Sequence, residues 1–194
     1  MAGKLDGKSI AILATDGVEQ VELVEPRKAL EEAGARTELV SLEDGEIQGF
    51  NHLDHGDKLK VDRALADASA GDYDGLLIPG GVANGDFLRA DERAVRFTAA
   101  FAEAHKPIAA ICHAPWVLVE AGIVKGRTLT SWPSLQTDIR NAGGTWVDEE
   151  VHVDQGHVTS RRPDDIPAFS AKAIEEFSEG RHEDMPQPAG TATA

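Results

Sequence analysis

Short strand-like segments alternate with segments of helical period along this chain of 194 residues. The strand-like segments span residues 9–15, 37–41, 75–79 and 108–111. Most of them are continuous apolar runs, which are typical of parallel strands buried on both faces. Strands that alternate with helices predict an α/β fold: a single-domain doubly wound sandwich with a mainly parallel central sheet.

Helices are predicted where apolar residues recur at intervals of three and four. These segments are 22–33, 91–104, 116–121, 135–142 and 164–177. Gly34 suits the end of the first helix, and Asp91 suits the N-cap of the second. The polar segment 43–62 is predicted to form short hairpin or loop elements, and 146–159 to contain short strands.

The composition excludes several classes of protein. The formal net charge is -15 and only 5% of residues are aromatic, so we expect no nucleic-acid partner and no membrane partner. A single cysteine forbids an internal disulfide and suits a reducing compartment. No apolar leader or membrane-spanning run is present, so we expect a cytoplasmic protein. We expect one domain over 1–178 and a flexible tail over 179–194, which is polar and rich in Pro, Gly and Ala.

The single cysteine, Cys112, lies where a buried strand gives way to a helix. Pro115 suits the first turn of that helix, so the sequence has the layout of a nucleophile elbow. A nearby helix N-terminus would favour the thiolate, and His113 offers a proton acceptor. The alternative is that Cys112 is a small buried apolar residue without a chemical role.

Three strand ends carry unusual residues that a parallel sheet would bring to one edge. Glu19 follows the first strand, Gly80 and Gly81 follow the strand at 75–79, and Cys112 follows the fourth. The two glycines either aim backbone amides at an oxyanion or simply end a strand. Glu19 either contacts the thiol or lies on the surface at a helix start.

A third group is needed to orient the imidazole of His113, and Asp86 is the nearest acidic candidate. The pairs His52/His55 and His152/His157 lack metal-ligand spacing, so we expect no metal site. Phosphate loops of the Walker or dinucleotide type are absent from the sequence, and we expect no cofactor.

Four motifs resemble those of the ThiJ/PfpI superfamily, and within it the intracellular protease I (PfpI) family, whose members are often named general stress proteins. The motifs lie at 18–26, 77–81, 110–115 and 121–130, and the resemblance runs from about Ser9 to Phe177. It implies a flavodoxin-like fold similar to the class I glutamine amidotransferases.

The resemblance also implies roles for individual residues. Cys112 would be the nucleophile, His113 the base, and Glu19 the carboxylic acid that contacts the sulfur. Gly81 and His113 would supply oxyanion-hole amides. The orienting acid would come from a loop of the partner subunit, at Asp86, so the implied assembly is a homodimer or a higher oligomer. Two departures stand out: aspartate replaces the glutamate of archaeal members, and the loop is one residue longer.

A thiol with an adjacent histidine suits attack on a carbonyl carbon. We expect a cofactor-free glyoxalase or deglycase that protects against stress by acting on reactive dicarbonyls or early glycation adducts. The first alternative is a cysteine peptidase acting on peptides. The second is a non-enzymatic sensor of oxidative stress whose cysteine is oxidised to a sulfinate.

Overall fold

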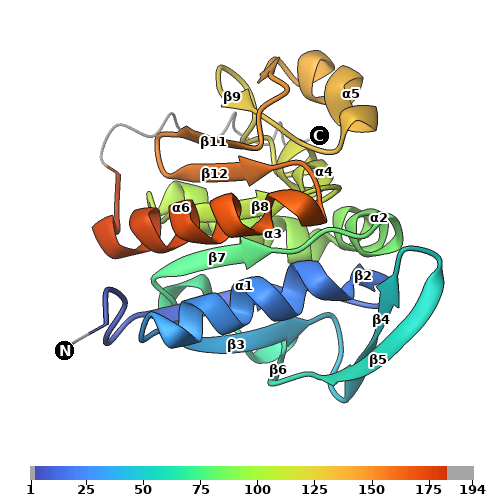
Figure 1. Cartoon of the computed structure of the whole chain (residues 1–194), viewed down its shortest axis with the longest axis vertical. Helices are drawn as coiled ribbons and strands as arrows, with labels where there is room; N and C mark the ends of the chain where they lie inside the picture. The colour runs from blue at the N-terminus through green and yellow to red at the C-terminus, as the bar shows by residue number, and fades with distance from the viewer. Residues whose placement is uncertain (1–2, 183–194) are drawn as a thin grey trace.

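A computed structural model describes residues 3–182, which form a central seven-stranded sheet in the order β11-β12-β8-β7-β1-β3-β6 (Figure 1). Five of the neighbouring pairs are parallel, and only β11 runs antiparallel to its neighbour. The strands are β1 Ser9–Leu13, β3 Arg36–Ser41, β6 Arg63–Ala64, β7 Gly75–Ile78, β8 Ile108–Ile111, β11 Val151–Asp154 and β12 His157–Ser160. The predicted flavodoxin-like α/β sandwich is confirmed.

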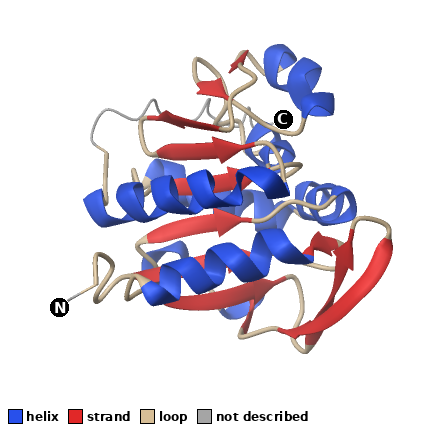
Figure 2. Ribbon diagram, viewed as in Figure 1, coloured by secondary structure: helices blue, strands red, loops and turns tan. Residues whose placement is uncertain are grey.

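Helices cover both faces of this sheet (Figures 1 and 2). One face carries α1 Gln20–Glu32 and α6 Ile166–Glu179. The other face carries α2 Val82–Ala90, α3 Glu92–Glu103, α4 Pro115–Glu120 and α5 Gln136–Asn141. Short 3-10 turns span Leu65–Asp67, Ala70–Asp72, Pro133–Leu135 and Pro163–Asp165. As predicted, Asp91 caps α3, and its side chain accepts from the amides of Arg93 and Ala94.

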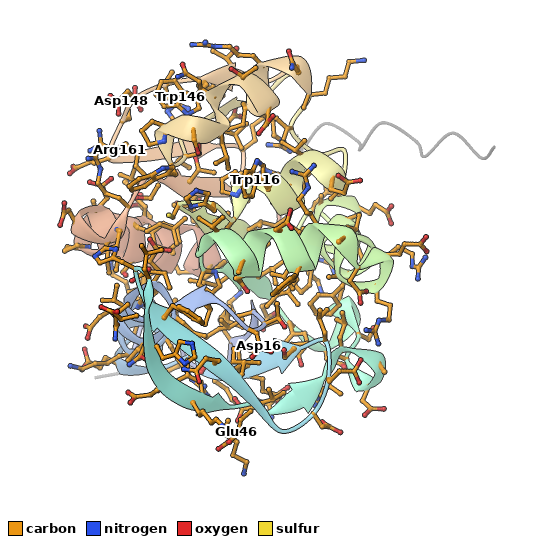
Figure 3. The ribbon with its side chains drawn as sticks, turned by 90° about the vertical axis from the view of Figure 1, so that its right-hand side faces the viewer. Asp16, Glu46, Trp116, Trp146, Asp148 and Arg161 are labelled. Carbon is orange, nitrogen blue, oxygen red and sulfur yellow. The ribbon has the colours of Figure 1, made fainter. Side chains whose placement is uncertain are left out.

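Two small sheets flank the edge at which the parallel strands end. One joins β2 Val18–Glu19 to the hairpin of β4 Glu46–Asn51 and β5 Asp54–Lys60, which confirms a hairpin within 43–62. The other pairs β9 Thr128–Leu129 with β10 Thr145–Trp146. Figure 3 views this edge, with the hairpin below and α5 above. Beside the upper sheet, Arg161 and Asp148 form an ion pair at 2.7 Å.

The sheet separates two apolar clusters. Leu76, Ile78 and Phe101 belong to the cluster under α3, whereas Ile10, Leu77 and Phe177 belong to the one under α1 and α6. All six are fully buried or nearly so, as the continuous apolar runs predict. Within residues 3–182, no helix is both long enough and apolar enough to cross a membrane.

One element was not expected from the sequence. Asp86 was predicted to lie in a loop, but it is within helix α2, which begins directly after Gly81. Contacts of Asn84 and Gly85 with residues distant in sequence explain why a helix forms here. The buried Asn84 side chain donates to the carbonyls of Pro79 and Gly80 and accepts from the Thr15 amide. Gly85 lacks a side chain that would crowd the His113 carbonyl, so α2 packs closely on α4.

The predicted tail begins at residue 179, where α6 ends. The described part of this segment folds back, because the His182 amide donates to the His105 carbonyl at 3.0 Å. The remainder of the predicted tail, 183–194, lies outside the described residues.

Candidate active site

Cys112 occupies a strained turn between β8 and α4. Its φ of 63° lies in the left-handed region, which non-glycine residues rarely adopt. Backbone hydrogen bonds hold it there: its amide donates to the Ser160 carbonyl, and its carbonyl accepts from the Trp132 amide. The elbow geometry predicted from the sequence is therefore present, and it turns the thiol toward the carboxyl edge of the sheet.

The imidazole of His113 lies beside the thiol, with its Nδ1 3.2 Å from Cys112 Sγ. Its ring stacks on Trp132 at a centroid distance of 5.6 Å and contacts Trp116 at 5.3 Å. Burial lowers the pKa of His113 to about 4, so the ring is neutral at neutral pH and can accept a proton.

The carboxyl group at the sulfur belongs to Glu22, which corrects the assignment of Glu19 to that role. Glu22 is fully buried in the first turn of α1, hydrogen-bonds the Cys112 side chain, and accepts from the Gly80 amide at 2.9 Å. Burial raises the pKa of Glu22 to about 8, so this side chain is a neutral carboxylic acid at neutral pH.

Glu19 points elsewhere because it precedes α1 rather than lying on its inner face. Its carboxylate accepts from the His52 amide at 3.1 Å and so joins the start of α1 to the β4–β5 hairpin. The sequence signal for the correct residue is that Glu22 lies three positions on, directly before the core residue Leu23.

The glycine turn after β7 places two backbone amides at the sulfur. The amides of Gly81 and His113 both donate to Cys112 Sγ, so the structure brings together the two predicted oxyanion donors. Gly81 has a φ of 96°, and a Cβ at Gly80 would lie 2.6 Å from the Cys112 Cβ. Both positions therefore require glycine. Their role toward an oxyanion stays a prediction.

The thiol is not activated by its position alone. Burial and the neighbouring Glu22 raise the pKa of Cys112, whereas the amides of Gly81 and His113 lower it. The backbone amides favour the thiolate, as expected of a helix start, but burial outweighs them in the resting protein. A base must take the proton as the sulfur attacks, and His113 is placed to do so.

A pocket of about 550 Å³ opens above the thiol. Besides the predicted residues, its walls contain several aromatic and apolar side chains that sequence reasoning missed. These are Phe50, His52, Leu53, Val82, Phe87, Trp116, Trp132 and Pro163. Figure 3 shows Trp116 between the hairpin and the upper sheet. The pocket lining includes three acidic residues (Glu19, Glu22 and Asp86) and lacks lysine and arginine.

Asp86 lines the mouth of this pocket but does not meet His113 of the same chain. No hydrogen bond or ion pair joins the two side chains in the described part of the protein, and Asp86 is exposed. The structure thus brings together Cys112, His113 and Gly81, adds Glu22, and leaves Asp86 at the rim. The described residues around the thiol contain no group of three metal ligands.

Comparison with known proteins supports a common ancestry over nearly the whole chain. Residues 8–176 match the profile of the DJ-1/PfpI family. YraA of Bacillus subtilis, named as a candidate cysteine protease, is 45% identical over 86% of this chain and 96% of its own. General stress protein 18 of the same species is 43% identical over 87% of this chain and 96% of its own length. Protein/nucleic acid deglycase 2 of Escherichia coli is 37% identical over 86% of this chain and 96% of its own length.

A solved structure supports the fold. The crystal structure of Drosophila melanogaster DJ-1beta superposes with a TM-score of 0.81 at 27% identity, covering 88% of this chain and 90% of that one. Relatives named as a deglycase and as a candidate cysteine protease support enzyme activity in general.

Proposed function

The chain belongs to the DJ-1/PfpI family, and we propose that it is a cysteine-dependent enzyme that attacks carbonyl groups of reactive dicarbonyls or early glycation adducts. The observation that carries this proposal is the neutral His113 ring 3.2 Å from the Cys112 sulfur, at the base of an open pocket. No cofactor is required by the chemistry. The free thiol suits a reducing cytoplasm.

In the proposed reaction with methylglyoxal, the thiol proton moves to His113 Nδ1 as the sulfur bonds to the aldehyde carbon. His113 returns the proton to the carbonyl oxygen, which gives a hemithioacetal. Loss of the proton on the former aldehyde carbon and protonation of the neighbouring ketone oxygen then give an enediol. The second carbon takes a proton as the hydroxyl on the first carbon loses one, which leaves the first carbon oxidised to a thioester and the second reduced to an alcohol. Water cleaves the thioester, and the products are lactate and the free thiol.

Two groups beside the sulfur support this assignment. The amides of Gly81 and His113 can stabilise negative charge on the sulfur or on the bound oxygen. The neutral Glu22 carboxyl can donate to the sulfur without adding a second negative charge. An ionised carboxylate at this position would oppose the attack.

The first test is methylglyoxal consumption, with lactate as the product, by the wild type and by Cys112→Ala. A fluorescent casein assay on the same samples measures peptidase activity. Cysteine-dependent lactate formation without casein cleavage supports the proposal. Absence of lactate formation by the wild type contradicts it.

A peptidase is the second candidate because YraA, 45% identical, is named as a candidate cysteine protease. The same thiol and histidine would attack a peptide carbonyl. Casein cleavage that depends on Cys112, without lactate formation, would favour this function.

A third function is oxidation sensing, supported by the Glu22 contact with the sulfur and by the similarity to general stress protein 18. A carboxylic acid beside the sulfur would stabilise a sulfinate by hydrogen bonding. If neither assay shows activity, peroxide-dependent mass addition to Cys112 becomes the next measurement.

We further propose that a second copy of the chain covers the pocket mouth and supplies Asp86 to the partner's His113. The rim carries exposed apolar side chains: Leu53 is 92% exposed, Val82 58% and Phe87 50%. Val82 and Phe87 flank Asp86 on α2. Such an apolar rim is typical of an interface between subunits.

Mixing two inactive variants tests this arrangement. Cys112→Ala and Asp86→Ala subunits are unfolded together and refolded, so that mixed dimers form. If Asp86 acts across the interface, one of the two sites in each mixed dimer is intact, and about a quarter of wild-type activity returns. No recovery, or a monomer by light scattering, would contradict the proposal.

A further inference from the structure

A second cluster of chemically active side chains lies at the edge opposite Cys112, where the parallel strands begin. Helix α6 ends there, as its deep red end shows in Figure 1. Glu176 and Glu179 lie one turn apart on α6, and Gly180, with a φ of 85°, turns the chain so that His182 returns toward them. One ligand atom from each of the three residues lies within 4.8 Å of the others.

Two of these atoms face each other away from solvent. Glu176 Oε2 and His182 Nε2 lie 3.1 Å apart and form an ion pair when His182 is protonated. The pair lacks hydrogen-bond geometry, and neither atom has a hydrogen-bond partner elsewhere in residues 3–182. Buried polar atoms of this kind require an explanation. Zinc binds a carboxylate oxygen or an imidazole nitrogen at about 2.0–2.2 Å, so one ion can contact two atoms at this separation.

His157 is an independent sign of a missing partner. It begins β12, against which α6 packs, and it is only 1% exposed. Both of its ring nitrogens are buried without a hydrogen-bond partner among the described residues. An imidazole ring offers two nitrogens for hydrogen bonding, so a buried ring that uses neither has room for a bound partner such as water.

The local electrostatics favour a cation at this place. The C-terminal end of a 14-residue helix carries partial negative charge, and two carboxyl groups lie on it. The nearby Lys172 forms its ion pair with Glu175 at 2.7 Å, and the ion pair of Glu176 is with His182.

We propose that Glu176, Glu179 and His182 bind one divalent transition-metal ion, with His157, on the strand against which α6 packs, as a hydrogen-bond partner of metal-bound water. Two carboxylates and imidazole nitrogen suit Zn²⁺, whereas Mg²⁺ and Ca²⁺ prefer oxygen ligands alone. Bound there, the ion fastens the segment after α6 to the helix at the edge away from the catalytic thiol. Its role is structural and does not depend on the proposed reaction.

The test measures Zn²⁺ binding to the full chain by calorimetry, in a Cys112→Ala background that removes the thiol as a competing ligand. One ion per chain is expected. His182→Gln and Glu179→Gln should each weaken binding at least about tenfold. The matched control is His55→Gln, because His55 is an exposed histidine on the hairpin and should leave the affinity unchanged.

Thermal unfolding gives a second readout, since an ion that binds only the folded state raises the melting temperature. Zn²⁺ should raise it in the Cys112→Ala protein and not in His182→Gln. Circular dichroism without metal checks that the variants fold; both changed residues are outside the core, unlike Glu176. Absence of binding, or equal affinity in His182→Gln and His55→Gln, would overturn the proposal.

Discussion

Buried polar groups have different partners at the two edges of the central sheet. At the carboxyl edge, the Cys112 sulfur contacts Glu22 and the amides of the glycine turn and of His113, and Glu22 Oε2 accepts from the Gly80 amide, although Glu22 Oε1 has no partner among the described residues. At the amino edge, Glu176 and His182 pair only with each other, and both ring nitrogens of His157 have no hydrogen-bond partner within residues 3–182.

The difference separates two kinds of site. At the carboxyl edge, the carboxyl of Glu22, the thiol of Cys112 and the imidazole of His113 lie in contact, and the one group that we propose to be missing is the Asp86 of a second copy. At the amino edge, the cation that we propose would satisfy the buried atoms. The proposed reaction at the first edge uses protein atoms alone, whereas the proposed site at the second needs a bound ion.

The largest effect is expected for Cys112→Ser, which tests whether the carboxyl edge depends on the thiol. Serine keeps the turn but is a far weaker nucleophile, so activity should fall by about 10⁴-fold or more. Steady-state kinetics with methylglyoxal measure this. Zn²⁺ affinity at the amino edge should not change, and retained activity would remove Cys112 from the mechanism.

A matched pair of glycine substitutions, one at the start of β7 and one in the turn that follows it, tests the two edges separately. In Gly80→Ala, the new Cβ would collide with Glu22 and lie 2.6 Å from the Cys112 Cβ. In Gly75→Ala, it would lie 2.6 Å from Cδ1 of Phe177, beside Glu176. Both should cost about 1–3 kcal/mol of unfolding free energy, because both overpack the interior.

Only Gly80→Ala should also lose activity, by about 100-fold or more, since it displaces the acid and the thiol together. Chemical denaturation and kinetics on the same samples separate the two effects. An active Gly80→Ala enzyme would show that the close approach of this turn is unnecessary.

The raised pKa of Glu22, about 8, predicts a pH dependence at the carboxyl edge. Activity should fall above about pH 8, when Glu22 becomes an anion beside the sulfur, and below about pH 4, when His113 is protonated. Glu22→Gln keeps a hydrogen-bond donor and cannot ionise, so it should remove the alkaline fall. If Glu22→Gln loses activity above about pH 8 as the wild type does, Glu22 is not the group that causes the alkaline fall.

The same group affects stability with a definite sign. The folded protein keeps the Glu22 proton up to about pH 8, whereas the unfolded chain releases it near the ordinary value of 4.5. The contribution of Glu22 to stability is therefore fully present below pH 4.5 and is lost as the pH rises to about 8. Denaturation of wild type and Glu22→Gln across this range should show the wild type losing stability relative to the variant.

The smallest effect is expected for Glu19→Gln, the change that distinguishes the two glutamates. Glu19 is half-buried and contacts the His52 amide, so its loss should cost no more than about 1 kcal/mol. The rate of Cys112 alkylation by iodoacetamide should stay within about twofold of wild type. A larger change in Glu19→Gln than in Glu22→Gln would reverse the assignment made from the structure.

The fold followed from the sequence because periodicity and burial agree along most of the chain. The strand 108–111, the cap at Asp91 and the elbow at Cys112 were all predictable from local residues. Helix α2 was not, because Asn84 and Gly85 are poor helix formers and are favoured there by contacts distant in sequence.

The site was predictable only in part, for a related reason. Which glutamate contacts the thiol depends on where α1 begins, and helix boundaries are the least certain part of a sequence-based assignment. The walls of the pocket come from segments as distant as the hairpin and Trp132, which no local pattern connects. At the amino edge, the last helix was predicted to end at 177 and the tail to begin at 179, so neither the place of Glu179 on α6 nor the return of His182 was predicted.

The β4–β5 hairpin has a consequence for how such proteins diversify. It pairs with the two-residue strand β2 and not with the central sheet, yet its tip places His52 and Leu53 in the wall of the pocket. The parts that hold the thiol belong to the core, where change is costly. The hairpin lies outside the central sheet, so its sequence can change at little cost to the core. Changes there would alter which substrates fit the pocket and leave the residues around the thiol unchanged.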